Sequence, residues 1–467
     1  PCAVEDEQPN YSGFGYLVSG LAEAGYVALS VNINAENTFG FGEPVPGERL
    51  AQLLRAHLVA LETASAGGEN GFGVALNGRA DLSRIALAGH SRGGENAYWL
   101  THQQEWDVFP QGNDSIAGIL LVAASPATFF LETSDTPQAQ VLPNCDGDVI
   151  GLDGQLFYEH NRLDESHTAW MTSVVLARAN HNHFNSILRG DMAPQHSEGD
   201  RPDCDTLIEP EAQRQFLVDY AVDFLTVLFG EDADAVGQAQ RNLGLDVTAV
   251  APSELYGLPA RVAFQPPADK RQTLFVPRTA DEQTTNLLGG TVTAENVDTT
   301  FCPDRFYSPE SMPGTEACHR VNVIVPGQPA HAVLAWSAPG AAWRLGLPEG
   351  QGDLSGYTTL SLRVVADPLT MTEPPLFSLQ LTDTAGNTAV VTLSPDEPAL
   401  QLPEGAVRED EFLPAGVFRG IVPLLTLHVP LADFAGVDAA QVSEVAVLFD
   451  QTPSGAIFLA DVAATRP

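Results

Sequence analysis

Residues 84–94 read Arg-Ile-Ala-Leu-Ala-Gly-His-Ser-Arg-Gly-Gly, and this stretch decides the fold of the first half of the chain. A short apolar run typical of a strand leads into the pattern G-x-S-x-G, with Gly89, Ser91 and Gly93 at its fixed positions. A helix is predicted from about Gly94. In such a strand–turn–helix arrangement the serine has strained dihedral angles, and a Cβ atom two residues before or after it would clash with neighbouring backbone. The stretch therefore predicts a nucleophilic serine, Ser91, raised above the edge of a parallel sheet.

The residues on either side of this stretch alternate between helical and strand patterns. The predicted helices cover residues 11–24, 48–64 and 211–229, with a further helix starting at about residue 94. The predicted strands cover residues 26–31, 84–88, 116–123 and 172–178. Strands that alternate with helices form a parallel sheet covered on both faces. We therefore expect a doubly wound α/β domain over residues 1–230.

The pattern changes after residue 230. Residues 231–270 are acidic and rich in alanine, then in proline, and are predicted to be a linker. From residue 271 onward helical periodicity nearly disappears, and short apolar runs are separated by Gly, Pro, Asp and Asn. These predicted strands cover residues 273–276, 331–336, 359–365, 376–382, 389–393, 424–429, 445–449 and 456–460. Such spacing predicts an all-β antiparallel sandwich over residues 271–467.

Charge and hydropathy limit the possible partners. The net charge is −38, and Lys270 is the only lysine. A surface this negative repels phosphate groups, which argues against a nucleic acid or an anionic membrane as partner. No segment approaches the roughly 18 apolar residues that a membrane-spanning helix requires, so we expect no membrane span.

The five cysteines match no zinc-binding spacing. Cys302 and Cys318 flank one loop-like stretch, and Cys145 and Cys204 flank another. We predict these two disulfides, with Cys2 left over, and hence an oxidising compartment: a secreted, extracellular or periplasmic protein. Five free thiols are the alternative.

A serine nucleophile requires a base, and the base requires an orienting carboxylate, in the chain order Ser, acid, His. Asp146 and Asp148 are the candidates for the acid, because an apolar run breaks there into a turn with two carboxylates. His181 and His183 are the candidates for the base, in a loop that follows a predicted strand. His90, beside the serine, is given a structural role.

At these residues the chain resembles the α/β-hydrolase superfamily, specifically secreted bacterial esterases akin to dienelactone hydrolases, chlorophyllases and cutinase-like polyester hydrolases. The family places its acid in the pattern G-x-x-D-x-x-V, and residues 143–149 match it in frame with Pro in place of the first Gly, which favours Asp146. The family histidine usually follows as A-x-H, and residues 179–181 fit, which favours His181. The resemblance covers residues 11–229 and implies an α/β-hydrolase fold and hydrolysis through an acyl-enzyme, without a metal or an organic cofactor.

The oxyanion hole is only partly accounted for. By the same resemblance its first donor is the backbone N–H of Arg92, directly after the nucleophile. Family members take the second donor from a loop after the third strand, before the helix that here starts near Tyr11. Only ten residues precede Tyr11, so we expect the first strands and this loop to be absent from the sequence.

The second half resembles the jelly-roll modules attached to secreted hydrolases, many of which bind carbohydrate. Trp336 and Trp343 are candidates for stacking on sugar rings, although core packing is the stronger expectation. No carboxylate cluster has metal-loop spacing, so no metal is predicted. The leading hypothesis is a serine ester hydrolase whose ester substrate is either small or polymeric, with polysaccharide as a candidate partner of the sandwich. The alternative is a non-catalytic extracellular binding protein in which the hydrolase domain is a relic and the sandwich binds glycan.

Overall fold

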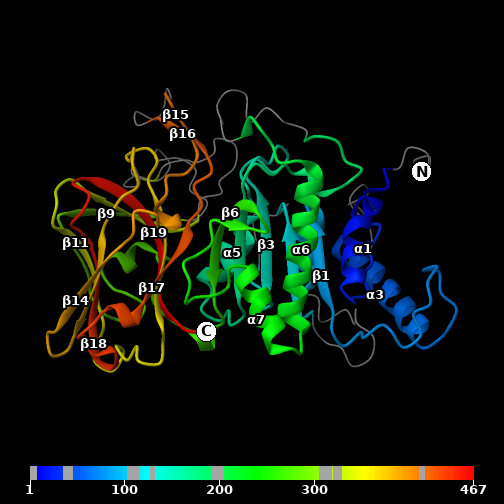
Figure 1. Cartoon of the computed structure of the whole chain (residues 1–467), viewed down its shortest axis with the longest axis horizontal. Helices are drawn as coiled ribbons and strands as arrows, with labels where there is room; N and C mark the ends of the chain where they lie inside the picture. The colour runs from blue at the N-terminus through cyan, green and yellow to red at the C-terminus, as the bar shows by residue number, and fades with distance from the viewer. Residues whose placement is uncertain are drawn as a thin grey trace.

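The computed structural model describes residues 8–34, 46–102, 116–126, 132–191, 204–303, 318, 329–409 and 416–467. A sheet flanked by helices forms one side of the molecule, and a set of antiparallel strands forms the other (Figure 1). No helix within these ranges is long and apolar enough to cross a membrane. The predicted leftover thiol, Cys2, lies outside the described residues.

The first part contains six α-helices and six strands among the described residues. The helices are α1 (Gly15–Glu23), α3 (Pro46–Ser65), α4 (Arg92–Leu100), α5 (Gln155–Leu163), α6 (Pro210–Phe229) and α7 (Ala233–Asn242). The strands are β1 (Ala86–His90), β2 (Gly118–Val122), β3 (Gln138–Pro143), β4 (Met171–Leu176), β5 (Glu254–Leu255) and β6 (Leu258–Gln265). The predicted strands 84–88, 116–123 and 172–178 correspond to β1, β2 and β4.

These strands form one sheet in the order β1-β2-β3-β4-β6-β5, and β1 to β4 are parallel. Every residue of β2 and β3 is buried, as expected for central strands covered on both faces. On one face, Leu120 and Val122 share a core with α1 and α6; on the other, Ile119 and Leu121 share a core with α3, α4 and α5. The predicted parallel arrangement with helices on both faces is therefore confirmed for β1 to β4, whereas β6 and β5 are antiparallel and make the whole sheet mixed.

Two sequence-based expectations differ from this sheet. Residues 26–31, predicted to be a strand, have no regular secondary structure and pair with no described strand. A β-rich run becomes a strand only when a neighbour takes up its backbone hydrogen bonds. Residues 231–270, predicted to be a linker, contain α7 and β6 instead. Strand β6 pairs antiparallel with β4, with Val262 opposite Val174, so this segment extends the first sheet.

The second part is built from antiparallel strands. They are β7 (Arg271–Phe275), β8 (Val292–Glu295), β9 (Val297–Cys302), β10 (His331–Trp336), β11 (Ala341–Gly346), β12 (Thr359–Ala366), β13 (Ser378–Asp383), β14 (Thr388–Thr392), β15 (Gly405–Arg408), β16 (Val417–Gly420), β17 (Leu425–Pro430), β18 (Val442–Phe449) and β19 (Gly455–Thr465). All eight predicted strands overlap one of these. Strands β8, β9, β11, β15 and β16 were not anticipated by the sequence pattern.

Two sheets of this part enclose a common core. One has the order β17-β12-β19-β10-β9, with β7 also paired to β19, and the other has the order β14-β13-β18-β11-β8. Trp343 is 2% exposed and packs edge-on against Phe275, and Trp336 is 4% exposed and stacks on Phe449. The predicted β-sandwich is confirmed, as is the core packing of both tryptophans. The disulfide Cys302–Cys318 is also present.

A buried ion cluster joins α5 to the sandwich. The Arg363 side chain on β12 donates to Glu159 on α5, and Arg162 on α5 donates to Asp461 on β19 at 2.6 Å. Arg162 also donates to Glu159 at 2.7 Å and to the carbonyl of Ala330 at 2.9 Å. Burial raises the pKa of Glu159, but the charges of Arg363 and Arg162 outweigh it and lower the value to about 2. The carboxylate is therefore ionised, and the two parts are held together by paired charges away from water.

Candidate functional site

Ser91 occupies a sharp turn between β1 and α4. Its backbone has φ 56° and ψ −128°, a left-handed conformation that is uncommon for a residue with a side chain. Three hydrogen bonds hold this conformation: Ser91 N–H donates to the carbonyl of Val122 at 2.9 Å, and the carbonyl of Ser91 accepts from Gly94 N–H at 2.9 Å and from Ser125 N–H at 3.2 Å. The residue is partly exposed, and no hydrogen bond of its hydroxyl is found among the described residues. The turn places the hydroxyl at the carboxyl edge of the parallel sheet.

The glycines around Ser91 have different roles. A Cβ at Gly89 would lie 2.0 Å from the carbonyl oxygen of Gly93, so only glycine fits there. A Cβ at Gly94 would lie 2.6 Å from the Cβ of Ala124. The prediction of a clash at Gly93 is wrong. The atom nearest to a Cβ at Gly93 would be Ile33 Cδ1 at 3.8 Å, which is an ordinary contact. The close approach of turn and helix depends on Gly89 and Gly94, not on the second glycine of the motif.

Asp146 and His181 meet at the same edge of the sheet, in the loops that follow β3 and β4. His181 Nδ1 lies 2.8 Å from Asp146 Oδ2, and both residues are buried. Asp146 Oδ1 accepts from the backbone N–H groups of Asp148 at 2.8 Å and Val149 at 2.5 Å, which fixes the carboxylate in its loop. Since Nδ1 faces the carboxylate, Nε2 is the ring nitrogen left for a serine hydroxyl.

Asp146 also sets the proton affinity of His181. Burial lowers the pKa of His181, but the hydrogen bond and the charge of Asp146 outweigh it, together with the charges of Asp148 and Asp191. The net effect raises the pKa above the ordinary value of 6.5. A buried imidazole whose cation is stabilised in this way suits a base that receives a proton during the reaction.

The alternative acid and base have other contacts. Asp148 Oδ2 accepts from the Asn182 side-chain amide at 3.1 Å. His183 lies in the 3₁₀ helix Asn182–Phe184, and its carbonyl oxygen accepts a hydrogen bond from the Arg214 side chain at 3.4 Å. Burial and the charge of Arg214 lower the pKa of His183. The structure thus brings Asp146 together with His181, and no bond of this kind links Asp148 with His183 among the described residues.

The backbone of His181 is held on both sides by residues that the sequence pattern gave no functional role. Its carbonyl accepts from His90 Nε2 at 3.0 Å, and the two rings lie 4.7 Å apart. Burial and the neighbouring His181 lower the pKa of His90 to about 3, so His90 is neutral and donates from Nε2. Gln213 on α6 bonds to both backbone groups of Asn180. Because His90 directly precedes Ser91, it connects the serine turn to the histidine loop.

The loop that carries Asp146 is also tied covalently. Cys145 forms a disulfide with Cys204, which lies shortly before α6, with a Cα–Cα distance of 5.6 Å. This confirms the predicted bridge between the acid loop and the segment that enters α6. The residue next to Asp146 therefore cannot move independently of that segment.

The predicted oxyanion donor lies at the start of a helix. Arg92 is the first residue of the nine-residue helix α4. Backbone N–H groups of the first turn point out of the helix along its axis, and the helix dipole favours negative charge there. No second donor is assigned by the described contacts. Within the described ranges, no group of three or more His, Cys, Asp or Glu residues could hold a metal ion.

Two clefts, of about 280 and 340 Å³, lie between the first sheet and the sandwich. Asn144, two residues before Asp146, lines the larger one together with Arg261 and Glu404. Neither cleft has Ser91 or His181 in its wall. The chemistry expected at Ser91 therefore belongs to the carboxyl edge of the sheet and not to these clefts.

Comparison with known proteins adds little to the geometry. No family model and no curated protein matches the sequence. Among solved structures, the chain is similar to a family 11 carbohydrate-binding module from Clostridium thermocellum in complex with a β-1,3-1,4-mixed-linked tetrasaccharide, with a TM-score of 0.25 and 10% identity over 42% of this chain and 96% of that one. It is also similar to an exo-β-agarase, with a TM-score of 0.25 and 9% identity over 42% of this chain and 25% of that one. At these TM-scores neither similarity assigns a fold or an activity to this chain.

Proposed function

We propose that the protein is a serine ester hydrolase of the α/β-hydrolase superfamily, with Ser91 as nucleophile, His181 as base and Asp146 as the orienting acid. The observation that carries the proposal is the strained backbone of Ser91 at the edge where the buried Asp146–His181 hydrogen bond also lies. Strain is retained at a turn when the surrounding structure requires it, and it is common at catalytic residues. The α/β order and the two disulfides fit a secreted enzyme of this kind.

The proposed reaction uses these three side chains and the backbone N–H group of Arg92. His181 Nε2 accepts the proton of Ser91 Oγ as that oxygen attacks the carbonyl carbon of the ester. The Asp146 carboxylate stabilises the imidazolium that forms, and the Arg92 N–H donates to the developing oxyanion. His181 then returns the proton to the departing alcohol, which leaves an acyl group on Ser91. A water molecule, deprotonated by the same imidazole, releases the acid and restores the serine.

The test is covalent labelling of the serine. A fluorophosphonate probe is expected to label the wild-type chain at Ser91, and Ser91→Ala is expected to remove the label. Ser125→Ala, in the neighbouring segment at the same edge, is the matched control and is expected to keep it. Labelling of Ser91→Ala at the wild-type level would show that the nucleophile is another residue.

Polysaccharide binding by the sandwich stays a prediction. Trp336 and Trp343 cannot stack on sugar rings in this structure, because both are buried in the core. Retention of the protein in an affinity gel that contains a soluble β-glucan would test it. The ester substrate and its possible polymeric nature are tested by comparing turnover of p-nitrophenyl acetate with release of soluble products from a polyester film.

A further inference from the structure

A third carboxylate lies among the loops that carry Asp146 and His181. Asp191 is 5% exposed and follows His181 by ten residues. Its Oδ2 accepts from Gly147 N–H at 2.6 Å and from His181 N–H at 3.2 Å. Its Oδ1 accepts from Asn182 N–H at 2.9 Å. One side chain thus bonds to the backbone of both loops.

Two of the N–H groups that donate to Asp191 lie at or next to the proposed catalytic residues. Gly147 directly follows the proposed acid, and His181 is the proposed base. The bonds to Asp191 therefore set how far the two loops lie apart, and this separation determines the 2.8 Å contact between Asp146 Oδ2 and His181 Nδ1. Burial raises the pKa of Asp191, and the N–H groups of Asn182 and Gly147 act against it. Placing this carboxyl group close to Asp146 is costly, because burial and the nearby negative charge both oppose its ionised form.

We propose that Asp191 is a positioning residue: it holds the loop of Asp146 and the loop of His181 at the separation that the Asp146–His181 hydrogen bond requires. This inference rests on the proposed function, since the separation of these loops affects turnover only if Asp146 and His181 act on Ser91. An amide cannot replace the carboxylate. Asparagine has one acceptor oxygen, so its NH₂ group would face either the N–H group of Asn182 or those of Gly147 and His181, and the three hydrogen bonds cannot all be kept.

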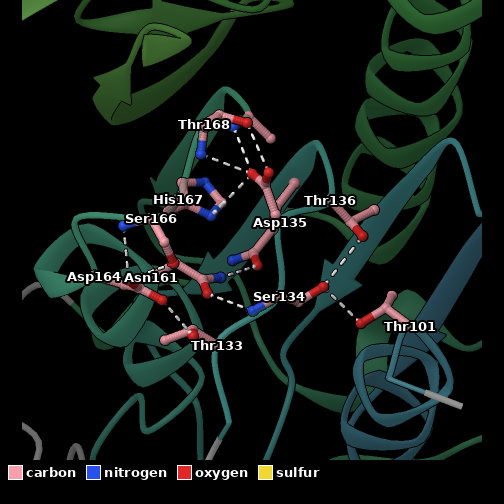
Figure 2. Close-up of polar contacts among 12 residues, drawn as sticks. Thr101, Thr133, Ser134, Asp135, Thr136, Asn161, Asp164, Ser166, His167 and Thr168 are labelled. Atoms are coloured by element: carbon pink, nitrogen blue, oxygen red, sulfur yellow. Dashed lines mark hydrogen bonds and ion pairs between the residues drawn. The ribbon is translucent and has the colours of Figure 1, made fainter.

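The opposite edge of the same sheet supplies a matched control. Asp135, shortly before β3, accepts from Thr168 N–H, Thr168 Oγ1 and Ala169 N–H just before β4, at 2.6–2.8 Å (Figure 2). It therefore joins the segments that enter β3 and β4, as Asp191 joins the loops that leave them. Asp135 lies at the amino edge of the sheet, away from Ser91, so its loss affects stability without affecting the triad.

The experiment compares Asp191→Asn with Asp135→Asn in the full chain. Asp191→Asn is expected to lower kcat on p-nitrophenyl acetate by about 100-fold with KM nearly unchanged, since small displacements of reacting groups cost rates of this order. Asp135→Asn is expected to lower the Tm and keep the wild-type kcat. Equal kcat values for Asp191→Asn and the wild type would overturn the proposal.

A second readout does not depend on turnover. The proton on His181 Nδ1 gives a downfield NMR resonance, identified by its loss in Asp146→Asn, and it is expected to shift in Asp191→Asn and to stay in Asp135→Asn. If the wild type hydrolyses no ester and takes up no fluorophosphonate, the proposed function fails, while an unchanged resonance in Asp191→Asn overturns the positioning role by itself.

Both measurements require that Asp191→Asn folds. If Asp191→Asn does not fold, Asp191→Glu takes its place, because it keeps both acceptor oxygens on a side chain one methylene longer. The proposal then expects a folded protein with a reduced kcat and a shifted resonance. A folded Asp191→Glu with the wild-type kcat and an unshifted resonance would overturn it.

Discussion

The side-chain amide of Gln213 is paired with the backbone of Asn180. Gln213 Oε1 accepts from Asn180 N–H at 3.0 Å, and Gln213 Nε2 donates to the Asn180 carbonyl at 2.6 Å. Both partners are buried. The pairing replaces the hydrogen bonds that a neighbouring strand would give, in a loop that has left β4. The peptide before His181 is thereby fixed to helix α6.

Replacing Gln213 with leucine is expected to destabilise the protein and lower its activity. Two backbone groups of Asn180 would be left buried without partners, at a cost of about 1–3 kcal/mol each. The free energy of unfolding, measured in urea, and kcat should both fall. Gln215→Leu, on the exposed face of the same helix, is the control, since among the described residues the Gln215 side chain bonds only to Asp219. Equal stability of the two variants would contradict this role of the amide.

The two histidines of the base loop are expected to respond very differently to alanine substitution. His181→Ala should lower kcat by about 10⁴-fold or more, as removal of a triad member typically does. His183→Ala should retain most of the activity, because His183 has no bond to Asp146 and its carbonyl contact with Arg214 is made by the backbone. Turnover of p-nitrophenyl acetate checks both. A larger loss for His183→Ala would move the base to that residue.

The pH dependence of turnover should follow the raised pKa of His181. The base must be neutral to accept a proton, so kcat/KM is expected to rise with pH, with its midpoint above the ordinary value of 6.5. The stability contributed by the charged imidazole has the opposite trend: it is present in full below pH 6.5 and is lost as the pH rises through the raised pKa. Asp148→Asn removes one of the charges that raise this pKa and should shift the midpoint to lower pH. A wild-type midpoint below 6.5 would count against this assignment.

The two glycines of the G-x-S-x-G pattern should not be equivalent. Gly89→Ala places a Cβ 2.0 Å from the Gly93 carbonyl oxygen, so the turn must move, and both Tm and fluorophosphonate labelling are expected to fall. Gly93→Ala meets only Ile33 Cδ1 at 3.8 Å and should keep a wild-type Tm. Thermal melting of the two variants is the measurement. Equal losses of Tm would show that the second glycine is needed for another reason.

The Cys145–Cys204 disulfide should support activity as well as stability. It closes a loop with a sequence separation of 59, which corresponds to about 4 kcal/mol in the chain-entropy model. The double variant Cys145→Ser/Cys204→Ser should lower both Tm and kcat, because Cys145 adjoins Asp146. Cys302→Ser/Cys318→Ser, in the sandwich, should lower Tm and leave kcat unchanged. A loss of kcat in Cys302→Ser/Cys318→Ser but not in Cys145→Ser/Cys204→Ser would contradict the role of the first disulfide in positioning Asp146.

The sequence predicted the elements whose apolar spacing is strongly periodic. Helix α6 is the clearest case, because its buried residues recur at helical spacing. Strand β2 is buried throughout, and the sequence predicted it as a short continuous apolar run. The turn at Ser91 was also predictable, since only glycine fits at position 89. In each of these cases the deciding interactions are local.

Partner-dependent features could not be predicted in the same way. Whether residues 26–31 or Leu258–Gln265 become strands depends on the neighbours available to them, and among the described residues only the second segment pairs with a strand, β4. Asp191 and Gln213 likewise have no distinctive spacing from the residues they hold. Their contacts depend on how the chain folds back on itself, over 44 residues between Gly147 and Asp191 and over 33 between Asn180 and Gln213.

The charges shared between α5 and the sandwich limit how this protein can be divided. A truncation after Lys270 would remove Arg363 and leave Glu159 with one of its two arginines, while an isolated sandwich would keep Arg363 without a counter-ion from α5. Each half would keep one ion pair, Glu159–Arg162 on α5 or Arg363–Asp461 in the sandwich, and would lose the two pairs that cross between them, Arg363–Glu159 and Arg162–Asp461. Neither half can therefore be exchanged for an unrelated module by recombination at the boundary alone. A replacement module would have to place a cation against Glu159 and an anion against Arg162.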